Sequence, residues 1–242
     1  MKILNTLIIL VILSVLTFAC KQSEVDPDIP ETPDEIIPSD LEPDILEELD
    51  SIFPPSKDFT NEYPSLFEES NSLNIVLTKE SEVYITFVLE GATLKNSLGY
   101  YIYNPSTSTV EVGELDLSIL FPHISDDILN QGDMLQLGDQ TFPAGTTVGF
   151  FLILDGWRTG QVNYENKTFY TDTYLNSEEV QQHVLFQFKN FNSIVLAFED
   201  QFINDERSDK DYNDVVFTVS DNQNNQAITR FNLNGIPTLK KP

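Results

Sequence analysis

The sequence predicts an all-β domain over residues 73–242, an antiparallel β-sandwich or jelly roll that follows a signal peptide and a disordered acidic linker. Three observations favour this fold class. Short runs of β-branched and aromatic residues recur between turn-forming residues. Helical patterns are few and do not alternate with the strands, which excludes a parallel α/β sheet. Finally, the composition changes near residue 72, from acidic and proline-rich to apolar and strand-forming.

The N-terminus has the layout of a secretory signal peptide. Lys2 supplies a positive charge, and residues 3–19 form an almost uninterrupted apolar run. Residues 1–19 are therefore expected to be removed on export. A retained membrane anchor is the alternative, because the run is close to the minimum length for crossing a bilayer.

Cys20 is the only cysteine and directly follows the apolar run. The sequence from Leu16 to Cys20 resembles a lipobox, with Ala19 as its small residue. Lipid on Cys20 would hold the mature chain on a membrane through buried methylene groups. We therefore expect a lipid-anchored protein of the cell envelope, on the outer membrane and either periplasmic or surface-exposed.

Residues 20–72 are expected to form an acidic, proline-rich tether. Residues 21–72 contain 16 of the 39 acidic side chains and only two basic ones. Such a segment buries too little apolar surface to offset its chain entropy. Within it, residues 44–53 could form a short amphipathic helix with Ile45, Leu49 and Ile52 on one side. The net charge of −26 argues against a nucleic-acid partner.

The domain contains several short runs with the composition of strands, bounded by Asn, Asp, Gly or Ser. These runs are residues 81–89, 147–154, 183–188, 193–198, 215–219 and 227–233. Helical signals are restricted to residues 117–129, which could hold a turn or two, and to a helix start at residues 177–179. Eight to ten strands of this kind predict a sandwich or barrel rather than a helical fold.

The densest chemistry lies in residues 199–214, between two predicted strands, where seven of 16 residues are acidic. Strand alternation places Asp200 on one face with Leu196 and Phe198, while Asp214 continues a face of the next strand. Carboxylates that continue buried rows need a counterion, because an unpaired buried charge is costly. The acidic residues are thus expected to gather at the strand ends.

Asp209, Asp211 and Asp214 place three oxygen donors on a tight turn, and two more carboxylates return from the adjacent strand end. A hard cation with six to eight oxygen ligands suits this arrangement, and calcium suits it better than zinc. The alternative is an acidic hairpin loop that Arg207 and Lys210 partly neutralise. Spacing alone does not decide between them.

Residues 196–200 and 208–217 together resemble the signature of the LruC-type domain, a domain of unknown function numbered 4114. The family occurs in exported bacterial proteins, including many Bacteroidetes lipoproteins. Residues 87–92 and 95–101 are similar in the same order, so the resemblance covers about residues 73–220. It implies a secreted β domain with a calcium site and no known catalysis. The acidic matches carry over as metal-ligand candidates: Glu199, Asp200, Asp209, Asp211, Asn213 and Asp214.

We therefore expect a non-catalytic module of the cell envelope with a structural calcium ion (Ca2+). Its role at the surface would be structural or adhesive, or it would bind a glycan or protein ligand. Two histidines, no free thiol after lipidation and no nucleophile motif argue against an enzyme. One alternative is a carbohydrate-binding lipoprotein that uses exposed aromatic residues, with Trp157, Tyr100 and Tyr101 as candidates. A glycan hydrolase built on two carboxylates is the remaining alternative.

Overall fold

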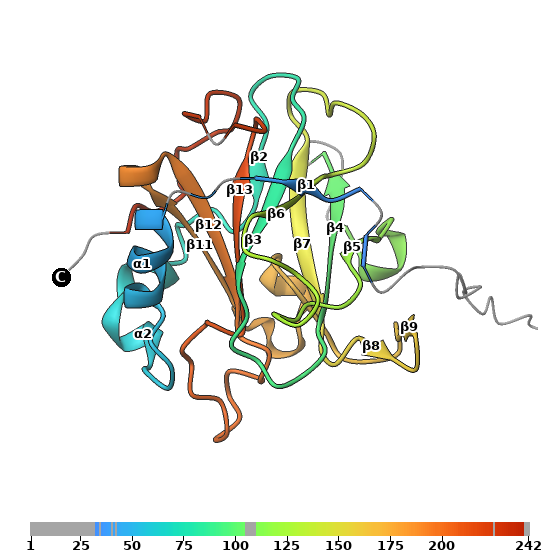
Figure 1. Cartoon of the computed structure of the whole chain (residues 1–242), viewed down its shortest axis with the longest axis vertical. Coiled ribbons are helices and arrows are strands. Elements are labelled where there is room, and N and C mark those ends of the chain that lie inside the picture. The colour runs from blue at the N-terminus through green and yellow to red at the C-terminus, as the bar shows by residue number, and fades with distance from the viewer. Residues whose placement is uncertain are drawn as a thin grey trace, which may run out of the picture.

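The computed structural model describes residues 32–33, 35–39, 41, 43–104, 110–224 and 226–239. The predicted signal peptide (residues 1–19) and Cys20 lie outside the described residues. Two antiparallel sheets face each other across one core (Figure 1). The predicted all-β, antiparallel sandwich is therefore confirmed.

Six strands form the larger sheet, in the spatial order β1 (Ile37–Pro38), β6 (Asp133–Gln136), β3 (Tyr84–Leu89), β13 (Val215–Ser220), β12 (Ser193–Phe198) and β11 (His183–Phe188). The second sheet has the order β10 (Thr168–Tyr170), β7 (Thr147–Ile153), β4 (Ser97–Tyr103) and β5 (Ser118–Phe121), with β2 (Ile75–Val76) also paired to β7. A separate hairpin joins β8 (Trp157–Arg158) to β9 (Gln161–Val162). All these pairings are antiparallel.

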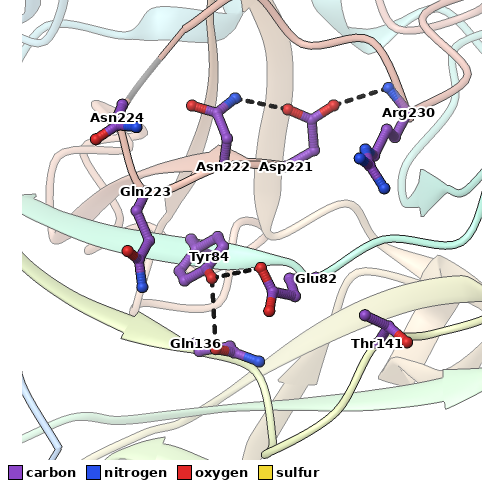
Figure 2. Close-up of a pocket in the computed structure, with 9 residues that line it drawn as sticks. All are labelled: Glu82, Tyr84, Gln136, Thr141, Asp221, Asn222, Gln223, Asn224 and Arg230. Atoms are coloured by element: carbon purple, nitrogen blue, oxygen red, sulfur yellow. Dashed lines mark hydrogen bonds between the residues drawn. The ribbon is translucent and has the colours of Figure 1, made fainter.

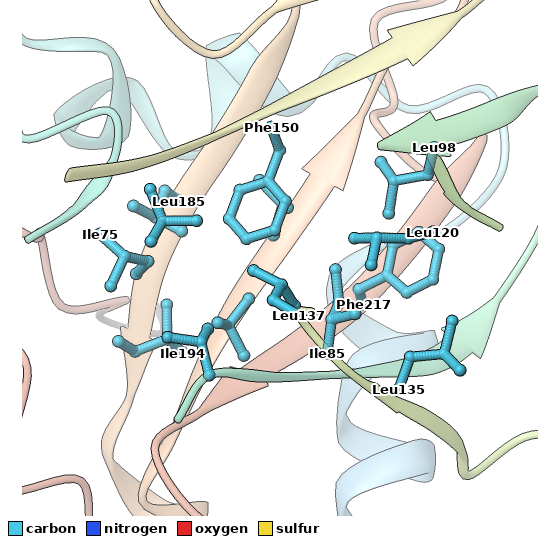
Figure 3. Packing of buried hydrophobic residues seen from close by; sticks show 14 of the residues in the cluster. Ile75, Ile85, Leu98, Leu120, Leu135, Leu137, Phe150, Leu185, Ile194 and Phe217 are labelled. Atoms are coloured by element: carbon cyan, nitrogen blue, oxygen red, sulfur yellow. The ribbon is translucent and has the colours of Figure 1, made fainter. Parts of the chain in front are cut away.

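Side chains from both sheets fill the layer between them. Figure 3 shows Phe150 and Leu98 from one sheet opposite Leu185, Ile194 and Phe217 from the other. Strand β7 is buried at every position, because a further apolar cluster covers its outer face. This explains why its sequence reads as a continuous apolar run instead of an alternation.

Residues 43–67, here called the N-terminal strap, pack on the outer face of the six-stranded sheet (Figure 1). The strap contains α1 (Pro43–Ile52), α2 (Phe59–Glu62) and the 3₁₀ turn η1 (Pro64–Phe67). The predicted amphipathic helix is present, and Ile45, Leu49 and Ile52 are all buried.

The prediction of a disordered tether over residues 20–72 is thus wrong for the strap. The apolar stripe that the sequence predicts within this segment packs on a matching apolar face of β11, β12 and β13. The buried sheet residues under the strap include Val184, Phe186, Val195, Ala197 and Val216. Burial of the stripe on this face offsets the chain entropy that composition alone suggested would win.

Three further elements differ from the sequence-based expectation. Residues 227–233 form no strand, and the pairing there is an isolated bridge between Leu77 and Phe231. Residues 117–129 contain strand β5, and the helical character predicted there is limited to one turn, which the Leu129 N–H closes by donating to the Ser125 carbonyl at 2.8 Å. The helix start at residues 177–179 is the short 3₁₀ element η4 (Ser177–Glu179).

The other short helical elements are η2 (Val112–Glu114), η3 (Thr173–Leu175) and η5 (Lys189–Phe191). None of the helices in the described part of the chain has both the length and the apolar character needed to cross a bilayer.

Because the strap packs through its apolar stripe, shortening a side chain of that stripe should lower the stability of the protein. Leu49 is fully buried against the sheet, so Leu49→Ala should lower the free energy of unfolding by about 3 kcal/mol, as in other core positions. Denaturant titration would measure this change. Glu47→Ala, at an exposed site of the same helix, should change it by less than about 0.5 kcal/mol. Equal effects of the two substitutions would contradict the packing of the strap.

Candidate metal centre

The loop of residues 199–214, here called the acidic loop, joins β12 to β13 at one end of the six-stranded sheet. It is the orange loop at the bottom of Figure 1. Because Phe198 pairs with Val215, the first and last residues of the loop start side by side. Ala197 faces the strap and Phe198 faces the inter-sheet core, so Glu199 and Asp200 leave the strand toward opposite faces.

Three carboxylates of the acidic loop converge. One ligand oxygen each from Glu199, Asp209 and Asp211 can be chosen so that all lie within 4.8 Å of one another. Glu199 and Asp211 are buried, with 0% and 4% of their surface exposed, whereas Asp209 is exposed. The cluster is therefore half enclosed, with one side toward solvent.

The backbone around Asp211 adopts an uncommon conformation. Lys210 and Tyr212, on either side of Asp211, have φ values of 58° and 54°. Left-handed backbone at residues with a side chain costs about 1–2 kcal/mol each, and such strain gathers at ligand sites when the surrounding structure holds it. Two strained residues in close succession therefore accompany the convergence of the carboxylates.

Neighbouring donors hold Glu199 and Asp211 in place. Ser208 Oγ donates to Glu199 Oε1 at 3.0 Å, and the Tyr212 backbone N–H donates to Oε2 at 3.4 Å. Asp211 Oδ2 accepts hydrogen bonds from the Ser56 backbone N–H at 2.7 Å and from Asn213 Nδ2 at 2.9 Å. The Asn213 N–H donates to Asp211 Oδ1 at 3.1 Å.

Asp200 and Asp214 form an adjacent pair that lies outside the convergent set. Asp214 Oδ2 accepts a hydrogen bond from the Asp200 backbone N–H at 2.6 Å, and Asp200 Oδ2 accepts one from Asn96 Nδ2 at 2.8 Å. Of the six predicted metal residues, the structure thus brings Glu199, Asp209 and Asp211 into one set. Asn213 positions Asp211, and Asp200 and Asp214 stand beside the set.

Burial dominates the electrostatics of the site. It raises the pKa of Glu199 to about 7, and the negative charges of Asp209 and Asp211 add to this effect. Burial likewise raises the pKa of Asp200, Asp211 and Asp214, again with contributions from neighbouring carboxylates. Without a positive partner, the site therefore holds protons at pH values where exposed carboxyls have lost them.

Basic side chains do not supply that partner among the residues that the structure describes. Arg207 forms its ion pair with Asp205, which lies in the same loop but outside the cluster. The other ion pairs in the described part of the chain join Lys57 to Glu62 and Arg158 to Asp155. Lys210 forms no ion pair with a described residue, and its charge acts on Asp58 of the strap. These contacts weigh against the alternative in which Arg207 and Lys210 partly neutralise the acidic loop.

Sequence reasoning missed Glu90, which directly follows β3 at the same end of the six-stranded sheet as the acidic loop. Burial and the charge of Asp126 raise its pKa to about 7, and Asp200 adds to the shift. Glu90 lines a pocket of about 500 Å³ that also contains Asp126 and Asp127. An acidic residue directly after a buried strand, followed by a glycine, was the signal that could have identified it.

Gly91 explains how β3 approaches the acidic loop. Its N–H donates to the Asn213 carbonyl at 3.0 Å, and a side chain at this position would overlap the Asn213 side chain. Glycine is thus needed for the close contact between the end of β3 and the residue that holds Asp211.

The three candidate aromatic residues do not form an exposed platform, so that prediction is wrong. Trp157 is 6% exposed and stacks on His123 with ring centroids 6.1 Å apart. Tyr101 is fully buried and donates its hydroxyl to Asp172 at 2.8 Å. Tyr100 is half-buried and lines a groove apart from the other two residues, together with Leu117 and Gly138. Trp157 and Tyr101 are buried in the apolar cluster on the outer face of the second sheet. Strand composition alone could not reveal this burial.

A polar depression of about 580 Å³ lies at the opposite end of the six-stranded sheet, near the end of β13 (Figure 2). Figure 2 shows Tyr84 donating to Glu82 and Asp221 accepting from the Arg230 backbone N–H. Asp221 also accepts from Asn222 and Thr229. Among the described residues, the carboxylates of this depression, Glu82 and Asp221, belong to no convergent set of three, so it is a weaker candidate for a cation than the acidic loop.

The convergent set offers only oxygen ligands, of which two are held by hydrogen bonds and one faces solvent. Hard divalent cations prefer such ligands, and calcium accepts irregular sets completed by backbone carbonyls and water. A cation here would also supply the positive charge that burial of Glu199 and Asp211 requires. Glu199, Asp209 and Asp211 are therefore the residues that could hold a metal.

Comparison with protein families gives one match. Residues 142–222 match the family described as Domain of unknown function (DUF4114). The match covers about a third of the chain and includes β7, β10 to β13 and the whole acidic loop. No curated protein and no solved structure matches the chain.

The raised pKa of Glu199 predicts a pH dependence of stability when no cation is bound. The folded protein keeps a proton up to about pH 7, whereas the unfolded chain releases it near pH 4.5. The free energy of unfolding should therefore fall as the pH rises between these values. In Glu199→Gln this fall should be smaller, as measured by denaturant titration in EDTA at several pH values. Glu206→Gln, at an exposed site, is the control and should keep the full fall. Stability that rises with pH over this interval in the parent protein would contradict the burial of Glu199.

Proposed function

We propose that this protein is a non-catalytic, lipid-anchored module of the cell envelope whose acidic loop holds a structural calcium ion. One observation carries the calcium proposal, namely the convergence of Glu199, Asp209 and Asp211 without a basic partner among the described residues. The match of the acidic loop to a domain of unknown function adds no activity of its own.

The calcium ion would be held by carboxylate oxygens of Glu199, Asp209 and Asp211, with Asn213 orienting Asp211. When bound, the ion would supply a positive charge that holds the carboxylates of the acidic loop together, next to the ends of β12 and β13. Ser208 and the Tyr212 N–H already orient Glu199, so little side-chain freedom remains to be lost on binding. This preorganisation favours an ion that is part of the fold.

A structural role is supported by the place of the site. The ligand residues connect the ends of two neighbouring strands, and Asp211 also contacts the strap through Ser56. An ion that joins the two arms of this loop stabilises the folded state, since the unfolded chain offers no such site. These features favour a structural ion over a reactive one, and we therefore propose no catalysis.

The envelope location is supported by the sequence of residues 1–20 alone, with Cys20 as the lipid attachment point and the membrane as partner. A structural, adhesive or ligand-binding role at the surface is consistent with an anchored domain. The carbohydrate-binding alternative loses its aromatic platform, because Trp157 and Tyr101 are buried. Of the three candidates, half-buried Tyr100 still lines a groove of about 600 Å³, together with Tyr164.

Calcium should stabilise the protein through the acidic loop. At a calcium concentration 100-fold above the dissociation constant, the free energy of unfolding should rise by about 2.7 kcal/mol. Thermal unfolding in EDTA and in calcium would show this as an increase in Tm. The double substitution Asp209→Asn and Asp211→Asn should abolish the increase, and Glu206→Gln in the same loop should retain it. A calcium response of equal size in the double variant would place the ion elsewhere.

A further inference from the structure

The strap and the acidic loop are joined by backbone hydrogen bonds. The Ser56 N–H donates to the carboxylate of Asp211 at 2.7 Å, and the Phe59 N–H donates to the Lys210 carbonyl at 2.8 Å. These bonds reach Asp211, which is a proposed calcium ligand, and Lys210, the residue directly before it. The strap therefore contacts the ligand set itself and not only the sheet.

Tyr212 adds an apolar connection at the same place. Its fully buried ring lies 5.9 Å from the ring of Phe59 and 5.4 Å from that of Phe67, measured between centroids. Its backbone N–H donates to Glu199, and its hydroxyl donates to the Gln181 carbonyl at 3.0 Å. A displacement of the loop backbone at Tyr212 would thus disturb both the ligand set and the packing of the strap.

Ser56 meets the loop in a strained conformation. Its φ is 59°, in the left-handed region that a residue with a side chain adopts at a cost. Its side chain is exposed, so burial of the serine does not explain the strain. The positive φ instead sets the direction of the backbone N–H. The backbone at Ser56 is therefore arranged to aim its N–H at Asp211.

The helix α1 is attached in a different way. Ile45, Leu49 and Ile52 are buried in the cluster on the outer face of the sheet, whereas the hydrogen bonds to the acidic loop described above come from Ser56 and Phe59. Residues 53–67 also pack on the sheet, where the ring of Phe53 lies 6.2 Å from that of Phe186, measured between centroids. In addition they contact the acidic loop, so their docking depends on the shape of that loop as well.

We propose that calcium binding to the acidic loop and docking of residues 53–67 are coupled, so that each strengthens the other. This inference rests on the proposed calcium site. Without the ion, no positive charge holds Glu199, Asp209 and Asp211 together, so the segment of Asp211 and Tyr212 that the strap contacts is less firmly fixed. With the ion, Asp211 and Tyr212 are fixed, and residues 53–67 close on them.

The coupling is reciprocal by thermodynamic linkage. Docking of Ser56 on Asp211 preorganises a ligand, so loss of this contact must weaken calcium binding by the factor by which calcium strengthens docking.

Amide hydrogen exchange of the full-length chain in detergent, in EDTA and with calcium chloride, tests the proposal. Calcium should slow exchange about tenfold or more in residues 53–67 and in the acidic loop, and should leave α1 and β4 almost unchanged. Titration calorimetry on the same sample measures calcium binding independently. Binding that protects the acidic loop but not residues 53–67 would overturn the coupling and leave the calcium site intact. Absence of binding would overturn both.

A matched pair of substitutions at Ser56 tests the reverse direction. Ser56→Pro removes the N–H that Asp211 accepts and should weaken calcium binding about tenfold. Ser56→Gly keeps the N–H and suits a positive φ, so its affinity should equal or exceed that of the parent. Equal affinity of the two variants, each with the circular dichroism spectrum of the parent, would overturn the proposal.

If Ser56→Pro fails to fold, a second pair replaces it. Phe59→Leu shortens the ring that meets Tyr212, and Phe142→Leu makes the same change in the inter-sheet core. Only Phe59→Leu should weaken calcium binding, by several fold. Equal affinities of these two variants would also contradict the coupling.

Discussion

Burial of negative charge at one end of the six-stranded sheet is the constraint on which the rest of this structure depends. Glu199, Asp200 and Asp211 are almost entirely withdrawn from solvent, and none forms an ion pair with a described residue. An isolated buried carboxylate is costly, so such groups either keep a proton or acquire a cation. Retention of a proton makes stability depend on pH, and binding of a cation makes it depend on calcium. The carboxylates responsible for both effects lie in or beside the acidic loop.

The surrounding elements are arranged around that charge. The β12–β13 hairpin brings the two ends of the acidic loop together, Gly91 lets β3 approach it, and the strap closes it from the outer face. The apolar layer between the sheets provides a rigid base for these segments. The stability of the sandwich and the geometry of the carboxylates are therefore linked through the same strand ends.

Strand positions were largely predictable, because β7, β11, β12 and β13 combine apolar runs with clear turn residues at both ends. Helix α1 of the strap was also predictable, from the spacing of Ile45, Leu49 and Ile52, but the docking of the strap was not, since its acidic and proline-rich composition favoured disorder. The decisive factor was the apolar face of the sheet, which no local pattern in residues 43–67 reveals. Burial of Trp157 and Tyr101 likewise depends on a cluster assembled from several distant segments.

The position of the acidic site was also predictable, but its internal arrangement was not. Spacing identified the acidic residues, yet the side to which each turns depends on the left-handed backbone at Lys210 and Tyr212. It depends also on the Ser56 N–H, which lies 155 residues from Asp211 in the chain. Consequently, Asp200 and Asp214 were grouped with the ligands, although the structure pairs them beside the convergent set.

The most direct test of this account is a crystal structure of the protein grown in calcium, with the ion identified by anomalous scattering. The account predicts one ion bound by oxygens of Glu199, Asp209 and Asp211 at about 2.3–2.6 Å. An ordered acidic loop in saturating calcium whose carboxyl groups bind no ion, or an ion held by other residues, would contradict it.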